Sequence, residues 1–454
     1  MGDSLEDASA EFTFSEEPFL KSSYNYSKEM VVNSLEFELA SFGSSNASLK
    51  KQNRNQFDYL KQTGFRDYDC NSVFKEEASY NSIAVGAARK TVRDGSGTAT
   101  LIACGIRGHN YGSEWVGNCY CGETGNHKGF ELARDQVVKF LKSYIKKYHV
   151  TGRIKLWVVG YSRGAAVANL VGGYLDDQNP FDNVTLRAKD LYVYCFEPPM
   201  CADSSNVNRS NYKNIHNVIN PCDLIVQIPL ASWGFGRYGV SHYLPSASMT
   251  KDYAALRNNM ILTFYKDYPG IISPVFIDTF QMLSFDPHKL TLTETGDRVT
   301  PVEFYGMLEK AIVRDVMPTR ADYLKYQGDI MELMIYLNAV DDSQKEEAFR
   351  LFAEKLSFHA ERLLRELTAG DVAKAGDDIL NDLTKSLNAA GITDYDSKQL
   401  KGLVRNFVAL VATLAVNDPE LTATLLVNLP GLLAGHLPEC SSAWIHSLPA
   451  DYFQ

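Results

Sequence analysis

The pattern of apolar and polar residues divides the chain into two regions of different character. From about residue 80 to residue 230, short apolar runs alternate with longer segments in which apolar residues recur at helical spacing. The short runs are typical of buried strands, and the longer segments are typical of amphipathic helices. Strands that alternate with helices predict an α/β fold, in which helices cover both faces of a parallel sheet.

The elements of this first region can be placed from the same runs. Strands are expected at 81–92, 98–106, 155–159, 191–196 and 214–219. Helices are expected at 130–148 and 165–175, and Asp94-Gly95 is expected to form the turn between the first two strands. We therefore expect an α/β core over residues 81–250. Ahead of it, residues 1–80 are expected to supply a surface wrap and helices.

Beyond about residue 250 the pattern becomes helical. Residues 300–435 hold apolar side chains at intervals of three and four, and strand signals are absent there. We expect a helical insertion over 251–430, followed by a C-terminal segment over 431–454 that returns to the core. The insertion is either a lid over a site or a structural support, and the pattern does not distinguish these two roles.

Composition and charge narrow the class of protein. Of the 454 residues, 45% are hydrophobic and 22% are charged, as is ordinary for a globular protein. The net charge of −10, without a block of Lys and Arg, argues against nucleic-acid binding and against a strongly anionic membrane surface. The apolar stretch 407–416 is too short to span a bilayer, so no stable membrane anchor is expected.

The N-terminus and the cysteines bear on the compartment. The first residues are acidic and polar, unlike a signal peptide, and Glu6 stands where a myristoylation site needs Ser or Thr. We expect a soluble protein, and its compartment stays open: cytoplasmic is the default, and secreted is the alternative if a leader has been removed. The eight cysteines form no paired C-x-x-C motif, which favours reduced thiols over a disulfide framework or a zinc site.

The most specific chemical motif is Gly-x-Ser-x-Gly at 160–164. It lies between the expected strand 155–159 and the expected helix 165–175. The two glycines would let strand and helix approach closely, and the sharp turn would expose the Ser162 hydroxyl. The helix N-terminus would offer unpaired N–H groups to a developing oxyanion. Ser162 is therefore the candidate nucleophile.

A serine nucleophile needs a base and an orienting carboxylate. After such a strand–serine–helix unit, the acid and then the histidine follow in chain order. Asp223 fits the acid, because Asn220-Pro221 ends an expected strand and Asp223 opens the following loop. Spacing alone does not choose among the downstream histidines, which are His242, His288, His359, His436 and His446.

Four blocks of sequence occur in a consistent order over roughly residues 80–230. They are LIACGIRGHNYGSEW (101–115), HKGF (127–130), the serine motif, and YCFEPP (194–199) with NVINPCDLIVQIP (217–229). These blocks resemble the class 3 lipases, an α/β-hydrolase family, and particularly its large bacterial members with helical insertions. The family's corresponding blocks are an Arg-Gly-Thr/Ser turn, His-x-Gly-Phe, the nucleophile elbow, and Phe-Gly-x-Pro with Asp-x-Val-Pro. The resemblance implies an α/β-hydrolase core with a mostly parallel sheet.

The resemblance also implies catalytic roles. Ser162 matches the family's nucleophile and Asp223 its orienting acid. His436 matches the base, because the segment from His436 to Glu439 has the family's His-x-x-Glu spacing. His446 and His242 are the alternative bases.

The oxyanion hole is expected to use the backbone N–H groups of Arg163 and His109. The family usually carries Thr or Ser at the second position, so an imidazole replaces a hydroxyl here. Arg163 replaces a common apolar residue. Its side chain is expected to make a structural contact, with binding of an anionic substrate as the alternative.

Aromatic residues near these positions are candidates for an acyl pocket or for plain core. They are Trp115, Trp233, Phe235, Tyr238 and Tyr243. The resemblance implies a lipase or esterase of lipid metabolism that cleaves a small-molecule or lipid ester through an acyl-serine, with no metal or organic cofactor. The alternatives are an acyltransferase or amidase with the same triad, and a catalytically silent binding protein of this fold. The oligomeric state stays open.

Overall fold

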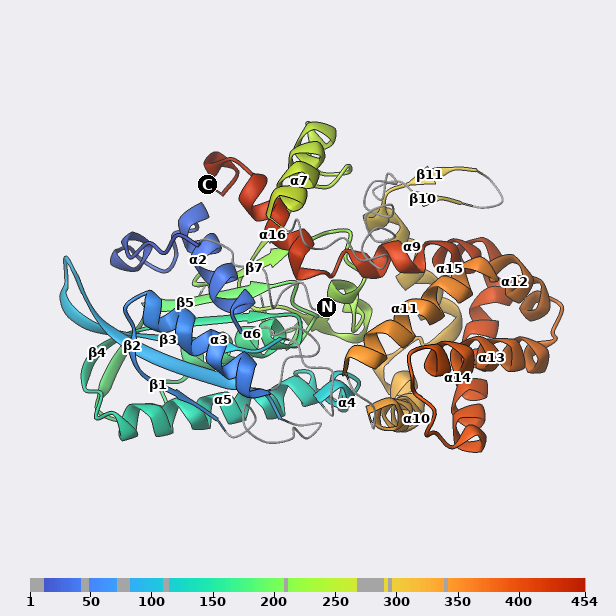
Figure 1. The fold of residues 1–454 in the computed structure, drawn as a ribbon, viewed down its shortest axis with the longest axis horizontal. Helices are drawn as coiled ribbons and strands as arrows, with labels where there is room; N and C mark the ends of the chain where they lie inside the picture. The colour runs from blue at the N-terminus through green and yellow to red at the C-terminus, as the bar shows by residue number, and fades with distance from the viewer. Residues whose placement is uncertain are drawn as a thin grey trace.

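A seven-stranded sheet forms the centre of the protein (Figure 1). The computed structural model describes residues 12–41, 49–71, 82–108, 114–207, 211–267, 290–292, 296–338 and 342–453. In spatial order the strands are β1 (Arg66–Cys70), β2 (Val85–Asp94), β3 (Gly97–Ile106), β4 (Gly152–Tyr161), β5 (Val184–Phe196), β7 (Ile215–Ile219) and β9 (Val240–Tyr243). Pairing is antiparallel from β1 to β3 and parallel from β3 to β9. The predicted α/β fold with a mostly parallel sheet is confirmed.

The sequence pattern missed the two strands at the edges of the sheet. β1 reads RDYDC and β9 reads VSHY, and both are largely half-buried or exposed. An edge strand has a neighbour on one side only, so it lacks the apolar run that identified the central strands. Two very short pairings were missed as well: β6 (Ala202–Asp203) with β8 (Phe235–Gly236), and β10 (Leu290–Thr291) with β11 (Arg298–Val299).

Helices cover both faces of the sheet (Figure 1). Successive side chains of a strand point to opposite faces. On β4, Leu156 and Val158 join one apolar cluster, whereas Trp157 and Val159 join the other. The first cluster is covered by α5 (Lys128–Lys147) and α6 (Arg163–Asp177). The second is covered by α2 (Lys28–Leu39), α3 (Leu49–Gln62), α7 (Tyr253–Asp267) and α16 (Pro438–Ser447).

The N-terminal segment completes the second of these cores. Phe19, in the short helix η1 (Glu17–Leu20), is fully buried, with its ring 4.9 Å from Trp157 and 5.4 Å from Tyr192. The indole Nε1 of Trp157 donates to Ser34 Oγ on α2 at 3.0 Å. The described part of the first thirty residues therefore packs into the core as well as along the surface.

A second layer of helices lies beside the sheet, coloured yellow to red in Figure 1. It comprises α9 (Pro301–Ala311), η5 (Ile312–Val316), α10 (Arg320–Asn338), α11 (Asp342–Phe358), α12 (Ala360–Thr368), α13 (Val372–Ala389), α14 (Ser397–Asn417) and α15 (Pro419–Ala434). Helices α11 to α14 share an apolar cluster of their own. In the described chain, one window of α14, Leu400–Asn417, is long and apolar enough to cross a membrane. It is longer than the stretch 407–416, and 41% of it is buried in the structure, including Leu400 and Val408.

Helix α10 is fastened to the loop between α4 (Glu114–Asn118) and α5 by polar contacts. The Arg320 guanidinium donates to the carbonyl oxygens of Gly122, at 2.7 Å, and Gly125, at 2.9 Å, and lies 4.3 Å from the centre of the Phe235 ring. Gln327 Oε1 accepts from the Cys121 N–H at 2.9 Å. Such contacts are directional, so they fix the position of the helical layer on the core.

Two histidines join the N-terminal segment to the far edge of the sheet. His216 on β7 and His242 on β9 face each other, with His216 Nδ1 and His242 Nε2 3.0 Å apart. His216 Nε2 lies 2.9 Å from the Ser23 carbonyl, which can only accept, so the neutral ring carries its hydrogen on Nε2. His216 Nδ1 then accepts from His242 Nε2–H. The Tyr26 ring stacks on His242 with centroids 3.5 Å apart.

The two rings cannot both be charged in this contact, because both facing nitrogens would then carry a hydrogen, and this predicts acid sensitivity. Burial lowers the pKa of His216 to about 4 and that of His242 to about 3. In the unfolded chain the two histidines have the ordinary pKa of 6.5, so between pH 6.5 and about 4 the unfolded chain binds protons that the folded protein does not bind. The free energy of unfolding therefore falls as the pH decreases through this range. Each histidine contributes a slope of up to about 1.4 kcal/mol per pH unit.

Urea unfolding at several pH values tests this expectation. His242→Gln keeps an N–H donor towards His216 but removes one titrating group, so the slope should become shallower. The exposed residue His149 offers a control, and His149→Asn should leave the slope as it is in the parent protein. Equal slopes for His242→Gln and the parent would contradict the assignment.

Candidate active site

Ser162 occupies the sharp turn between β4 and α6. Its backbone has φ +52° and ψ −122°, a conformation that L-residues rarely adopt and that costs about 1–3 kcal/mol. The Ser162 N–H donates to the Phe196 carbonyl at 2.9 Å, and the Ser162 carbonyl accepts from Ala166 N–H at 3.0 Å. The neighbouring strand and the helix thus hold the strained residue in place.

The two glycines of the motif allow the backbone segments to meet. A Cβ on Gly160 would lie 2.2 Å from the Gly164 carbonyl oxygen, and one on Gly164 would lie 2.3 Å from that of Ile106. Real Cβ atoms are essentially never found this close to another heavy atom. The two positions therefore require glycine because strand, turn and helix are in direct backbone contact.

His436 and Asp223 complete a hydrogen-bonded row with Ser162. His436 Nε2 lies 2.7 Å from Ser162 Oγ, and His436 Nδ1 lies 2.6 Å from Asp223 Oδ2. Asp223 is fully buried, and its Oδ1 accepts from the Ile225 N–H at 2.7 Å. Because a carboxylate only accepts, it holds the His436 hydrogen on Nδ1 and leaves Nε2 free to accept from the serine hydroxyl. This arrangement can draw the hydroxyl proton away from Ser162.

The turn between α15 and α16 brings His436 to this position. Gly435 packs so closely on the Asp223 loop that a Cβ there would lie 3.0 Å from the Cys222 carbonyl oxygen. The Gly435 carbonyl accepts from Asn220 Nδ2 at 3.0 Å, which ties the turn to the end of β7. On α9, the Tyr305 hydroxyl donates to the Cys222 carbonyl at 2.7 Å. The helical layer therefore supports both sides of the contact between His436 and Asp223.

Of the two expected oxyanion donors, one lies in the described chain. Arg163 is the first residue of α6, so its N–H has no acceptor within the helix. His109 lies outside the described residues. The turn that leads to it is anchored by the Gly108 N–H, which donates to the buried Glu38 Oε1 on α2 at 3.2 Å, and by a buried ion pair of Arg107 with Glu114.

The Arg163 side chain makes structural contacts. Its guanidinium donates to Asn118 Oδ1 at 2.9 Å and to the Ser82 carbonyl at 3.1 Å. It is almost fully buried, and burial lowers its pKa to about 10. The guanidinium is thus engaged by the protein, which favours the structural reading over recognition of an anionic substrate.

The alternative bases have other partners. His446 Nδ1 lies 3.2 Å from Ser442 Oγ on α16, and His242 pairs with His216. His359 Nδ1 lies 2.6 Å from Asp382 Oδ2 within the helical layer, and His288 lies outside the described residues. Among the candidate histidines in the described chain, His436 is the one that contacts Ser162.

The aromatic candidates for an acyl pocket are dispersed. Trp233 Nε1 donates to the Met317 carbonyl at 3.0 Å, and Phe235 is buried beneath Arg320. Tyr238 packs on Tyr212 with ring centroids 4.6 Å apart. Tyr243 is exposed on the edge strand, and the side chain of Trp115 lies outside the described residues. These contacts account for the described members one by one, and the role of these residues in an acyl pocket stays a prediction.

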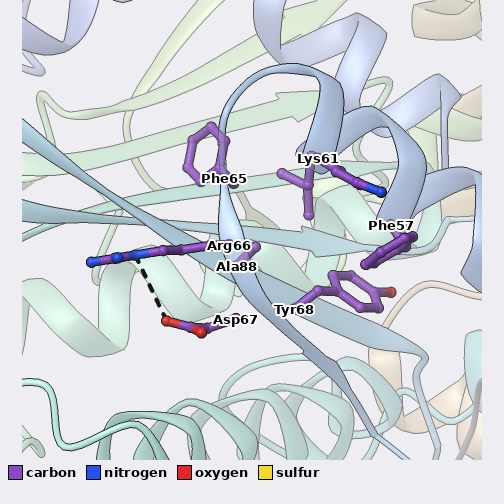
Figure 2. A pocket seen from close by; sticks show the side chains of 8 residues that line it. Phe57, Lys61, Phe65, Arg66, Asp67, Tyr68 and Ala88 are labelled. Atoms are coloured by element: carbon purple, nitrogen blue, oxygen red, sulfur yellow. Dashed lines mark ion pairs between the residues drawn. The ribbon is translucent and has the colours of Figure 1, made fainter.

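A hollow of about 330 Å³ lies at the β1 edge of the sheet, between α3 and β1 (Figure 2). Its lining residues are Phe57, Leu60, Lys61, Phe65, Arg66, Asp67, Tyr68 and Ala88. None of Ser162, Asp223 and His436 belongs to this lining. The hollow is therefore separate from the candidate active site.

Comparison with known proteins gives one family and a group of similar structures. Residues 95–233 match the family described as lipase (class 3). The resemblance to class 3 lipases is confirmed over this segment. It includes Ser162 and Asp223, but not His436. The bacterial affiliation of the resemblance stays a prediction.

Several solved lipase structures resemble the chain. A triacylglycerol lipase, described as having a serine protease triad as its catalytic centre, is 19% identical and aligns over 49% of this chain and 84% of its own, with a TM-score of 0.35. The native Rhizomucor miehei lipase–propeptide complex is 17% identical and aligns over 54% and 78%, with a TM-score of 0.35. Lipase II from Rhizopus niveus is 17% identical and aligns over 42% and 74%, with a TM-score of 0.29. Comparison with curated proteins gave no match.

The close packing at the serine turn predicts a large effect of one methyl group. Gly160→Ala should lower the free energy of unfolding by about 1–3 kcal/mol or more, because the new Cβ collides with backbone atoms. Gly306 on α9 is the control, since a Cβ there has no atom within 4 Å. Gly306→Ala should stabilise the protein by up to about 1 kcal/mol. Urea unfolding measures both effects, and equal midpoints for Gly160→Ala and the parent would contradict the packing argument.

Proposed function

We propose that the protein is a serine hydrolase that cleaves carboxylic esters, with lipid esters as its substrate class. This proposal rests on one hydrogen-bonded row of three side chains. His436 Nε2 lies 2.7 Å from Ser162 Oγ, and His436 Nδ1 lies 2.6 Å from Asp223 Oδ2. Supporting it are the strained serine turn and the match of residues 95–233 to the class 3 lipases.

The first half of the reaction forms an acyl-serine. As Ser162 Oγ attacks the ester carbonyl carbon, its proton passes to His436 Nε2 and the carbonyl oxygen becomes an oxyanion. Asp223 stabilises the imidazolium through the bond to Nδ1–H. The tetrahedral intermediate then collapses and expels the alkoxide. His436 gives its proton to the alkoxide, which leaves as an alcohol.

Water completes the reaction by the same route. His436 takes a proton from a water molecule, the hydroxide attacks the acyl carbon, and the Ser162 oxygen leaves and recovers the proton. The backbone N–H groups of Arg163 and His109 are the proposed donors to the oxyanion in both halves. Each such donor contributes about 3–4 kcal/mol of transition-state stabilisation.

We further propose that the helical layer is a support for the site rather than a freely moving lid. It leads through α15 directly into His436, and Tyr305 on α9 bonds the residue next to Asp223. Arg320 also binds two carbonyl groups of the core. Moving the layer as a body would break these contacts and would displace His436 from Ser162.

Single substitutions in the row test the proposed triad. A fluorophosphonate probe should label Ser162 in the parent protein but not in Ser162→Ala. His436→Ala should lower kcat for a nitrophenyl ester by about 10⁴-fold or more, with Asp223→Asn less severe. His446→Ala and His242→Ala are the controls and should retain most of the turnover. Unchanged turnover in His436→Ala, or no labelling of the folded parent, would contradict the proposal.

A series of esters tests the substrate class. If lipid esters are the substrates, kcat/KM for nitrophenyl esters should rise with acyl length, by up to about fourfold for each buried methylene. Adding an alcohol and measuring free acid against new ester distinguishes hydrolysis from acyl transfer. A maximum of kcat/KM at the acetate ester would argue for another substrate class. An excess of the new ester over free acid at low alcohol concentration would argue for an acyltransferase.

A further inference from the structure

A buried acidic residue lies among the three segments that carry the candidate triad. Glu197 directly follows β5, is fully buried, and has φ +47°, in the left-handed region. It corresponds to the glycine of the Phe-Gly-x-Pro block that residues 196–199 resemble. A glycine would adopt this backbone without strain, whereas a glutamate pays a steric cost.

The carboxyl group of Glu197 bridges two of these segments. Oε2 accepts from the backbone N–H of Asn220, at the end of β7, at 2.7 Å. Oε1 lies 2.7 Å from Ser441 Oγ on α16, the helix that follows His436. Asn220 also holds the Gly435 carbonyl, so both contacts of Glu197 lead to the turn that presents His436.

A chain of hydroxyl groups continues from Glu197 to His436 itself. Ser441 Oγ lies 3.2 Å from the Tyr161 hydroxyl, and this hydroxyl lies 3.2 Å from the His436 carbonyl oxygen. Tyr161 is the last residue of β4 and precedes Ser162. The carboxyl group of Glu197 is therefore linked to the backbone of the proposed base through two side chains.

Counting hydrogens along this chain assigns a protonation state. The His436 carbonyl only accepts, so the Tyr161 hydroxyl donates to it and must accept from Ser441. The single Ser441 hydrogen is then used, and the remaining contact of Ser441 with Glu197 Oε1 needs a hydrogen from the carboxyl group. Three contacts need three hydrogens, and the two hydroxyl groups supply two of them.

On balance the surroundings of Glu197 favour the neutral form, although the Ser441 and Asn220 contacts and the charge of Arg237 act in the opposite direction. The ionisable groups that face it are Asp223, Cys222, Cys440, Tyr161 and Arg237. Arg237 directs its guanidinium to the carbonyl oxygens of Pro198 and Val226 rather than to the carboxyl group. Burial raises the pKa of Glu197 well above its usual value, and the nearby negative charge of Asp223 raises it further.

We propose that Glu197 is a neutral carboxylic acid in the folded protein and acts as a positioning residue for His436. Its hydrogen goes to Ser441, and through Tyr161 the chain fixes the His436 carbonyl. Its carbonyl oxygen holds Asn220, and through it the Asp223 loop. The catalytic consequence rests on the proposed function, whereas the protonation state does not.

A direct measurement of the carboxyl group tests the protonation state without any turnover. The infrared spectrum of the parent protein at pH 7 should contain a buried, protonated carboxyl C=O band that is lost in Glu197→Gln. Absence of that difference would overturn the proposal. Because this readout does not involve Ser162, it remains decisive even if the protein hydrolyses no ester.

Kinetics test the positioning role. Glu197→Gln mimics a neutral acid, since its amide donates to Ser441 and its carbonyl accepts from Asn220. Glu197→Ala removes both contacts and should lower kcat about tenfold or more with little change in KM, and Glu197→Gln should restore kcat. Equal losses in both variants would overturn the proposal.

A second pair of variants covers the case in which Glu197→Ala does not fold. Ser441→Ala interrupts the same chain at α16 and should lower kcat in the same way. Ser442→Ala, on the neighbouring residue of that helix, removes a hydroxyl outside the chain and should leave kcat as in the parent. If Ser441→Ala and Ser442→Ala have equal kcat, the chain has no positioning role and the proposal fails.

Discussion

The hydrogen bond between His436 Nδ1 and Asp223 Oδ2 joins residues 213 positions apart, and much of the architecture depends on that contact. Beyond α7 the described chain builds a helical layer with an apolar cluster of its own, and it returns to the core at one turn. A hydrogen bond of 2.6 Å tolerates little displacement, so the returning chain has to place His436 accurately beside Asp223. Gly435 and Asn220 meet this requirement at the turn, and Arg320 meets it where α10 contacts the loop between α4 and α5.

The buried polar side chains at the two ends of β4 are arranged differently. Near its start, Arg153 pairs with Asp94 at 2.6 Å and with Asp190 at 2.8 Å, so each charge has a partner. Beyond its end lie a strained serine and two buried acidic side chains, Asp223 and Glu197. In α/β sheets, ligands bind at the carboxyl ends of the strands. Two residues with left-handed backbone, Ser162 and Glu197, and two buried carboxyl groups thus lie together at the end of the sheet where a ligand would bind.

Local patterns predicted the centre of the sheet well and its edges poorly. The apolar run before Ser162 and the small apolar residues after it gave β4 and α6, because both elements are buried on all sides. β1 and β9 face solvent and carry polar residues, so their pairing partners rather than their composition make them strands. In the site, Ser162 and Asp223 could be singled out from their places after strands, whereas spacing left five histidines in contention.

The sequence by itself determined the alternation of strands and helices, the glycine-flanked serine and the order of serine, acid and histidine, because these depend on neighbours within a few residues. Only the tertiary structure decided which histidine meets Ser162. It also decided that Arg163 points into the core and that Glu197 joins Asn220 to Ser441. These outcomes depend on contacts between segments tens to hundreds of residues apart, and such distances are set by packing of the whole fold rather than by any local pattern.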